Sequence, residues 1–391
     1  MTAAELRASL SLASIFGLRL LGMFIILPVF TLWTQGRPGW DLQLAGIAIG
    51  AYGLTQAILQ IPMGWLSDRL GRKRMIYAGL LAMAAGSFTC AASQTPTGMI
   101  VGRVLQGMGA ISGVAIAFAA DLTRDSQRSK AMAIIGSTIG AAFVISFVAA
   151  PSLEQAFGLN GIFAITGFLA LAAMAVTRWL VPEAPVAQRT PGSVAFSEVL
   201  RLPELIRLDV GIFVLHAVLM AMFVVVPVAL VRAGLPAAHH WWIYLGAMAG
   251  GLVLMLPALG ARTARRERPI FLAAVAVIAL GLAALAAALG SIPGMAGALV
   301  IVFAGFNVLE AKLPALVSRA APREARGAAT GVYSSVQFLG TFVGSAAGGA
   351  IAQHVGFAAV LGACLVITLA WLAVAWNMGD FVPAASGMAR R

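Results

Sequence analysis

The chain has 391 residues, of which 61% are hydrophobic and only 10% are charged, and its mean hydropathy is +0.95. A soluble domain of this length needs far more charged surface, so the composition excludes a soluble protein. Apolar stretches of roughly 18–25 residues recur along the chain, and each can cross a bilayer as a helix. We therefore expect an all-α polytopic protein embedded in the lipid bilayer, and not an enzyme.

Twelve transmembrane helices are expected at residues 9–33, 42–63, 75–93, 97–120, 131–151, 161–181, 208–230, 242–260, 269–289, 295–317, 327–350 and 357–377. The first carries Arg19 in its middle and leads directly into another apolar segment, which favours an uncleaved anchor over a signal peptide. The longest polar connection divides the helices six and six. This division predicts an N-terminal bundle at 1–181, a cytoplasmic linker at 182–207 and a C-terminal bundle at 208–391.

The net charge of +12 is distributed unevenly between alternate loops. Only Arg37 and Arg232 lie in one set of loops, and Arg19, Arg103 and Lys312 lie within helices, so the other 21 of the 26 basic residues lie in the opposite set. This asymmetry is the positive-inside rule, and it predicts that both termini are cytoplasmic. The basic excess is therefore a topology signal, and we expect no nucleic-acid partner.

Both cysteines lie inside apolar segments. Cys90 and Cys364 are far apart in the sequence, and neither has a neighbouring ligand-type residue at metal-binding spacing. We interpret them as small core residues. The sequence predicts no metal site and no cofactor.

Residues 64–74 read Gly-Trp-Leu-Ser-Asp-Arg-Leu-Gly-Arg-Lys-Arg and place five charges between two apolar segments. We interpret this run as a loop where the chain leaves the bilayer. The pattern G-x-x-x-D-R-x-G-R-K-R resembles the loop signature between helices 2 and 3 of the major facilitator superfamily. The resemblance implies two pseudo-symmetric six-helix bundles, with a substrate site between them.

In that family the aspartate of this loop, here Asp68, caps the start of a helix in the opposite half. The corresponding helix begins near Gly327, and a carboxylate is favourable at a helix N-terminus. The contact is expected to hold a cytoplasmic gate shut in the outward-facing state. The predicted gate residues are Gly64, Asp68, Arg69, Gly71, Arg72, Asp121 and Arg128. Alternatively, these charges only anchor the loop at the lipid headgroups.

Few ionisable residues lie deep within the predicted helices. Arg19, Arg103 and His216 lie in helices 1, 4 and 7, and Glu310 with Lys312 lies in helix 10. The resemblance implies that these four helices line the central cavity. Ionisable groups at this depth are costly unless they face a cavity or a partner, so the pattern predicts a polar transport pathway.

Glu310 is the candidate proton carrier, because the protonation of a carboxyl group responds to its surroundings. His216 can share the proton, since imidazole titrates near neutral pH. Arg103 begins the segment Arg-Val-Leu-Gln-Gly, which resembles the family's proton-coupling arginine motif, and Arg19 is a candidate counter-ion. The alternatives are a static ion pair of Glu310 with Lys312, Arg19 or Arg103, and a structural histidine.

Aromatic, methionine and amide side chains in the same helices are candidates for the wall of a cavity. The predicted substrate-cavity residues are Phe24, Tyr52, Gln56, Gln106, Met220, Phe223 and Asn307. Such a lining can repack around varied lipophilic substrates. Alternatively, any one of them faces lipid or a neighbouring helix.

Segments such as Arg19–Pro28 and Phe306–Glu310 resemble the YajR group of drug/proton antiporters of the inner membrane. Members of that group can carry a C-terminal soluble domain, for which this chain stops too early. The resemblance implies a monomeric inner-membrane transporter that exchanges protons for small lipophilic or cationic compounds by alternating access. A proton symporter or facilitator for a small metabolite is the first alternative, and a receptor or scaffold that transports nothing is the second.

Overall fold

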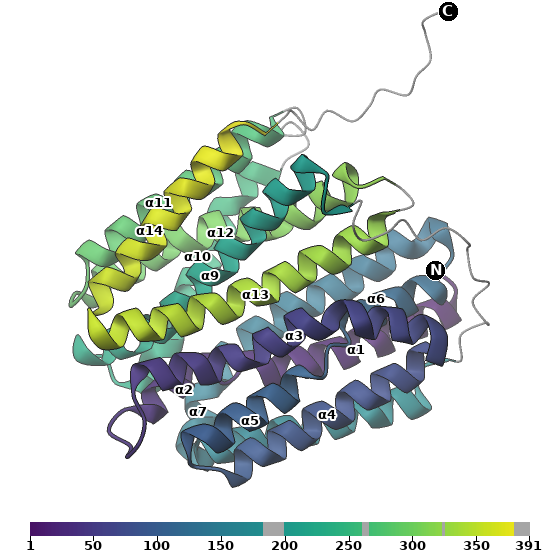
Figure 1. Ribbon diagram of the computed structural model, residues 1–391, viewed down its shortest axis with the longest axis horizontal. Helices are drawn as coiled ribbons and strands as arrows, with labels where there is room; N and C mark the ends of the chain where they lie inside the picture. The colour runs from purple at the N-terminus through teal and green to yellow at the C-terminus, as the bar shows by residue number, and fades with distance from the viewer. Residues whose placement is uncertain (183–198, 260–265, 323–324, 379–391) are drawn as a thin grey trace, which may run out of the picture.

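The computed structural model describes residues 1–182, 199–259, 266–322 and 325–378. The α-helices of this part of the chain are α1 (Ala3–Phe24), α2 (Leu27–Thr34), α3 (Leu42–Leu70), α4 (Arg72–Ala92), α5 (Pro96–Gly107), α6 (Ser112–Asp121), α7 (Asp125–Trp179), α9 (Pro203–Arg232), α10 (His240–Met255), α11 (Glu267–Ala287), α12 (Ile292–Ala320), α13 (Arg326–His354) and α14 (Phe357–Trp376). Two short 3₁₀ helices, Ala237–His239 and Leu256–Leu259, flank α10. The expected all-α fold is confirmed (Figure 1).

Eleven segments of the described chain are long and apolar enough to cross a membrane. One of them, Ser126–Trp179, has 54 residues. At the rise of an α-helix this length is about 80 Å, more than twice the hydrocarbon thickness. Gly158, with φ of 65°, interrupts the helix, so the segment accounts for two crossings. The segments together provide the twelve crossings that the hydropathy pattern predicts.

Two of the predicted helices are broken. The first divides into α1 and α2 around Ile25, just before Pro28, whose ring nitrogen cannot donate the hydrogen bond that would continue the helix. The fourth divides into α5 and α6 between Met108 and Ile111. At this second break, the Gly109 carbonyl accepts a hydrogen bond from a side chain of α1, so the break contributes to the polar centre.

The charged run at 64–74 was wrongly predicted to be a loop. Helix α3 continues through Asp68 to Leu70, and only Gly71, with φ of 98°, separates it from α4. With 29 residues, α3 is about 43 Å long, so its last turns extend beyond the hydrocarbon layer and can carry charge. The linker expected at 182–207 lies mostly outside the described residues, and α9 already begins at Pro203.

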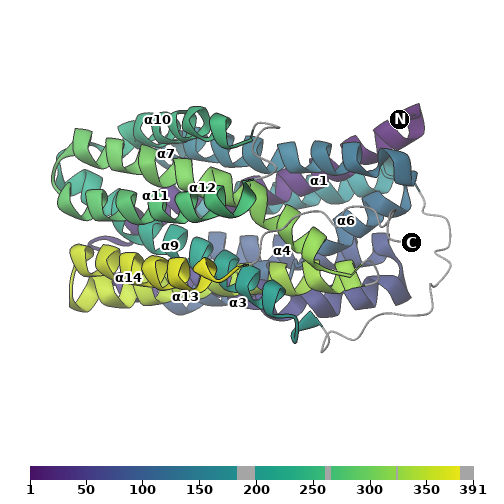
Figure 2. The same ribbon diagram turned by 90° about the horizontal axis from the view of Figure 1, so that it is seen from above.

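Helices α3 and α13 pack together at one end of the molecule, which we call the closed end. Here the backbone N–H of Leu42 donates to Gln353 at 3.1 Å, and His354 contacts Gln43 at 3.1 Å. Figure 1 shows the two helices adjacent at this end and diverging toward the other. Figure 2 shows α10 and α7 on the opposite side of the molecule. Helices from both halves of the sequence therefore close this end from two sides.

The opposite end, which carries residues 64–74, is called the motif end. A Cβ added at Gly64 of α3 or at Gly327 of α13 would meet no heavy atom within 4 Å. By contrast, a Cβ on Gly46, near the closed end of α3, would collide with the carbonyl oxygen of Ser345. The two helices are thus in backbone contact at the closed end and apart at the motif end.

Candidate functional site

Arg19 lies in the middle of α1 and is only 1% exposed. Its guanidinium group donates to the Gly109 carbonyl at 3.1 Å, to the Ser112 hydroxyl at 2.7 Å and to the Tyr52 hydroxyl at 2.9 Å. These acceptors belong to α3 and to the α5–α6 region, all in the first half of the chain. Arg19 therefore cross-links the helices of its own half.

Arg103 of α5 is held in a similar way and is 2% exposed. It donates to the carbonyls of Ala48 and Ile49 on α3, at 3.3 and 3.1 Å, and to the side-chain oxygen of Gln106 at 2.8 Å. Gln106 donates in turn to the Ser87 hydroxyl at 2.7 Å. The guanidinium group is thus satisfied by neutral acceptors, which a buried cation requires.

Tyr52 joins the two arginines. Its hydroxyl accepts hydrogen bonds from Arg19 and from Gln56, the latter at 3.1 Å, and its ring lies 4.9 Å below the Arg103 guanidinium carbon. Phe338 of α13 approaches the same ring at 6.4 Å between centroids. The predicted residues Arg19, Tyr52, Gln56, Arg103 and Gln106 therefore form one cluster, the arginine cluster, packed inside the first half.

The second half holds a separate cluster of the opposite character. His216 of α9 lies 2.8 Å from the Gln337 amide nitrogen of α13 and 3.9 Å from a carboxylate oxygen of Glu310 on α12. Its other ring nitrogen lies 3.3 Å from the Ile212 carbonyl. The Glu310 side chain is 37% exposed, and its oxygen nearest the histidine has no hydrogen-bond partner among the described residues.

These contacts define a neutral form of the histidine. The nitrogen near the Ile212 carbonyl carries the proton, so the nitrogen near Gln337 accepts a hydrogen bond from the amide. A second proton on His216 would displace that donor and would face the carboxylate of Glu310. The imidazole of His216 and the carboxylate of Glu310, both predicted from the sequence, therefore lie side by side in the second half.

The alternative ion pairs predicted for Glu310 are not formed with either arginine. Among the described residues, the Glu310 carboxylate lies 3.9 Å from the His216 ring, and Arg19 and Arg103 have hydrogen bonds to neutral acceptors. The two clusters therefore lie in different halves of the chain, positive in the first half and acidic in the second.

Several of the predicted wall residues lie in an aromatic cluster that joins the two halves. Phe147 of α7 packs against Phe223 of α9 at 4.9 Å and against Tyr244 of α10 at 5.2 Å. Phe24 meets Phe143 at 4.9 Å. Tyr52, Gln56, Gln106, Met220 and Phe223 are buried, and Phe24 and Asn307 are half-buried. In this state the residues predicted to line a cavity fill the space between the helices.

At the motif end, Arg72 connects two of the predicted gate residues. It forms ion pairs with Asp68 at 2.5 Å and with Asp121 at 3.0 Å, and it donates to the Ser67 hydroxyl at 2.6 Å. Arg69 lies over the Trp65 ring at 3.7 Å. All of these partners are in the first half. The contact of Asp68 with the second half stays a prediction for the opposite conformational state.

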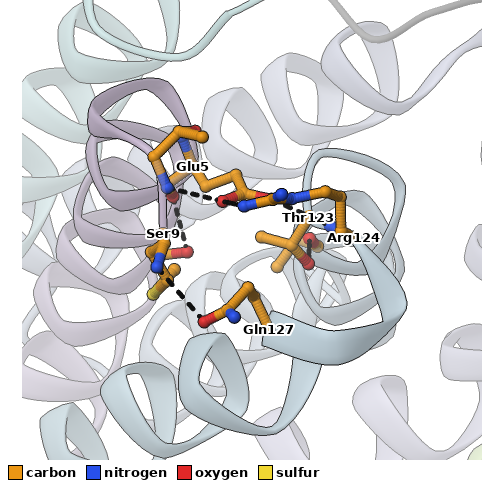
Figure 3. Close-up of polar contacts among 8 residues, drawn as sticks. Glu5, Ser9, Thr123, Arg124 and Gln127 are labelled. Carbon is orange, nitrogen blue, oxygen red and sulfur yellow. Dashed lines mark hydrogen bonds and ion pairs between the residues drawn. The ribbon is translucent and has the colours of Figure 1, made fainter.

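Arg128 of the predicted gate is exposed near the start of α7. Close to it lies a further contact that was not predicted from the sequence. Figure 3 shows Glu5 of α1 facing Arg124 across this region, with ion-pair distances of 2.7 and 3.0 Å. Glu5 also accepts from the backbone N–H of Thr2, which completes a capping box at the start of α1. The pair fixes the start of α1 against the start of α7, close to Asp121.

Three polar residues of the second-half cluster were missed. Gln337 and Tyr333 lie one turn apart on α13, and amide and phenol groups are common enough in apolar helices to pass unnoticed. Asp209 is 9% exposed and lies in the second turn of α9, which begins at Pro203; the helix predicted from residue 208 placed it at the helix end instead. The signal that could have identified Asp209 is its spacing of seven residues from His216, which places both on one helix face.

Twelve crossings arranged around buried polar clusters, joined at one end and apart at the other, define a membrane transporter. The sequence profile described as the Major Facilitator Superfamily matches residues 12–342. The chain belongs to that superfamily.

Similar proteins agree with this assignment. The inner membrane transport protein YajR of Escherichia coli (strain K12) is 41% identical over 385 residues, which cover 97% of this chain and 85% of that protein. The multidrug resistance protein MdtH of Aeromonas salmonicida (strain A449) is 24% identical over 340 residues, covering 86% and 85%.

Two solved structures have the same fold. The human organic anion transporter MFSD10 matches with a TM-score of 0.72 at 17% identity, and the nucleoside transporter NupG with 0.77 at 14%. Both matches cover 95% of this chain and 99% of the other.

Proposed function

We propose that this protein is a monomeric proton-coupled antiporter of the inner membrane that exports small lipophilic or cationic compounds by alternating access. The two bundles expected at 1–181 and 208–391, the second of which begins with α9 at Pro203, rock about the central site. The relationship to MdtH, whose name states multidrug resistance, supports an export role. The excess of basic residues at the motif end supports a cytoplasmic location for that end and for both termini.

The proposed substrate class rests on one observation, which is that the charged side chains near the centre of the molecule differ in their exposure. Arg19 and Arg103 are almost fully buried, and their donors are used by protein acceptors. Glu310, in contrast, exposes 37% of its side chain. Of Arg19, Arg103 and Glu310, only the negative charge is open to a ligand, which favours a cation or a neutral compound over an anion. This argues against the alternative in which the two arginines bind an anionic substrate.

Coupling follows from competition for Glu310. A cationic substrate and a proton both neutralise the carboxylate, and a neutral group crosses the low-dielectric centre at lower cost than a charged one. His216, 3.9 Å away, provides a second place for the proton when substrate approaches. Binding of one ligand thus releases the other, which is the requirement for antiport.

The gate at the motif end controls the order of these events. With the closed end toward the periplasm, the described state is inward-facing, and Asp68 is held by Arg72 within its own half. In the outward-facing state, Asp68 caps the start of α13 and holds the motif end shut. The aspartate therefore has one partner in each state, which makes it a two-position latch.

The proposal is tested in proteoliposomes with ethidium as a lipophilic cationic probe. An imposed pH gradient should drive ethidium transport by the parent, and Glu310→Gln should abolish that drive. Glu204→Gln is the matched control, because Glu204 is in a surface pair with Arg207 at the start of α9. Full pH-gradient-driven transport by Glu310→Gln would remove Glu310 as the proton carrier. Movement of proton and ethidium in the same direction would instead support the symporter alternative.

A further inference from the structure

Phe306 of α12 is an aromatic residue beside His216 and Glu310 to which the proposed exchange assigns no task. The centroid of its ring lies 6.0 Å from that of the His216 ring, and the two rings are inclined at 58°. A carboxylate oxygen of Glu310 lies 3.9 Å from the same imidazole. The ring of Phe306 and the carboxylate of Glu310 therefore approach one histidine from the same helix.

Helix α12 presents both groups on one face. Phe306 and Glu310 are four residues apart, a spacing that makes side chains neighbours on a helix. Within the run 302–310, Phe306, Asn307 and Glu310 are half-buried and the other residues are buried. The part of α12 that is open near its middle therefore consists of an aromatic ring, an amide and a carboxylate.

Phe306 also connects this face with the aromatic cluster between the two halves. Its ring centroid lies 6.0 Å from that of Phe303, and Phe303 lies 6.4 Å from Phe143 of α7, in the first half. Phe143 in turn packs against Phe147 at 4.5 Å. Phe303 is 2% exposed, whereas Phe306 is half-buried. Phe306 is therefore the more open of these two α12 rings, and it is the ring that lies beside the carboxylate.

A ring face and a carboxylate at this spacing suit one kind of ligand. The face of an aromatic ring carries partial negative charge and attracts a cation within about 6 Å of its centre. The carboxylate attracts the same charge by Coulomb's law. A charge that is delocalised over a flat ring system is more weakly hydrated than a compact ammonium group, so it is transferred from water to such a site at lower cost.

We propose that Phe306 is a specificity-determining residue, whose ring face binds flat, delocalised organic cations while Glu310 neutralises their charge. The rings of the ligand lie against Phe306, and the positive charge lies between that ring and the carboxylate. When a proton neutralises Glu310 instead, the ligand keeps only the attraction of the ring and is released. The inference names the substrate class of the proposed antiport and rests on that proposal.

A purely structural role for Phe306 would be to fill the space between His216 and Phe303. Removal of the ring would then lower the stability of the protein and the binding of any ligand together. Replacement of ring hydrogens by fluorine separates the two roles, because fluorine withdraws electrons from the ring face and changes the volume of the ring little. A cation-binding ring should therefore lose affinity with each added fluorine, and a space-filling ring should not.

The test measures equilibrium binding of ethidium to the whole chain at one fixed pH, by the fluorescence of the bound dye. Phe306→Leu should weaken ethidium binding by roughly 2- to 30-fold, the range of a cation–π contact. Phenylalanine analogues with one, two and three fluorine atoms at position 306 should weaken binding stepwise at an unchanged Tm. In transport, Phe306→Leu should raise KM for ethidium more than it lowers kcat, since the ring acts in binding.

Phe168 of α7 is the matched control position. Its side chain is 63% exposed, and its ring packs against Phe88 at 5.3 Å. The same fluorinated analogues at position 168 should leave ethidium binding unchanged.

Each other outcome contradicts a specific statement. Ethidium binding that is equal for all the fluorinated analogues overturns the role of the ring face, even where Phe306→Leu binds weakly. An equal loss at position 168 overturns it as well. A parent that exchanges ethidium for protons but does not respond to the fluorine series contradicts this inference alone, whereas a parent that binds no ethidium contradicts the proposed cation export together with it. If Phe306→Leu does not fold, the fluorinated analogues decide, because they keep the ring.

Discussion

The contact between α3 and α13 at the closed end makes the balance between the two conformational states sensitive to a single methyl group. A Cβ on Gly349 of α13 would collide with the Leu42 carbonyl oxygen and would lie 3.1 Å from the Gly46 Cα atom and 3.3 Å from the Gln43 Cα atom. These are backbone atoms, which cannot rotate away. Overpacking of this kind typically costs about 1–3 kcal/mol. Gly349→Ala should therefore push the two helices apart.

This contact joins the two halves and is broken when the closed end opens. The cost of the methyl group consequently falls on the described state alone, and the ratio of the two states should shift by about 5- to 150-fold toward the state that opens this end. Gly344→Ala is the matched control on the same helix, because its Cβ would collide with Ala217 of α9 within the second half. That variant should destabilise both states alike and lower Tm without a shift.

Double electron–electron resonance can measure the shift. Spin labels at Gln94 and Val355, two exposed positions at the closed end in different halves, report the opening. The buried cysteines Cys90 and Cys364 are first replaced by alanine. Gly349→Ala should add a population at longer distance, and Gly344→Ala should keep the parent distribution. An unchanged distribution in Gly349→Ala, or an equal shift in Gly344→Ala, would refute the reasoning.

Three further predictions concern the gate, the aromatic cluster and the arginine cluster. Asp68→Asn should favour the described state by several-fold, because the exposed pair with Arg72 that it weakens in this state contributes less than the helix cap that it weakens in the opposite state; unchanged accessibility of a cysteine introduced at the motif end would count against the latch. Phe147→Ala should lower the unfolding free energy by about 3–5 kcal/mol, through loss of its contacts with Phe223 and Tyr244, and a thermal-shift assay measures this. Arg19→Lys should lose at least one of the three hydrogen bonds of Arg19, and each buried acceptor left unpaired should lower the unfolding free energy by about 1–3 kcal/mol. A Tm equal to that of the parent would contradict this.

The sequence was sufficient for the number and order of the spanning helices, because about 20 apolar residues cross a bilayer whatever their neighbours are. It was not sufficient for the ends and breaks of the helices. The break before Pro28 was missed because proline is common in transmembrane helices. The extension of α3 to Leu70 was missed because a charged run outside the hydrocarbon layer can be helical as easily as a loop.

The candidate site was predicted as a list of residues, and the structure adds their grouping. That Glu310 lies beside His216, while Arg19 and Arg103 are hydrogen-bonded within the first half, depends on packing between helices that are distant in sequence. Single-residue patterns carry no information on such partners. Asp209 could have been found, since an aspartate seven residues before a histidine in an apolar run indicates a shared polar face.

Coupling of substrate export to proton entry through Glu310 is the central claim, and one measurement tests it most directly. Proteoliposomes containing the parent protein, an internal pH dye and an imposed ethidium gradient report the direction of proton movement. Ethidium leaving the lumen should bring protons in, and Glu310→Gln should remove that proton flux while ethidium still exchanges. Protons that leave with ethidium, or a proton flux unchanged in Glu310→Gln, would contradict the claim.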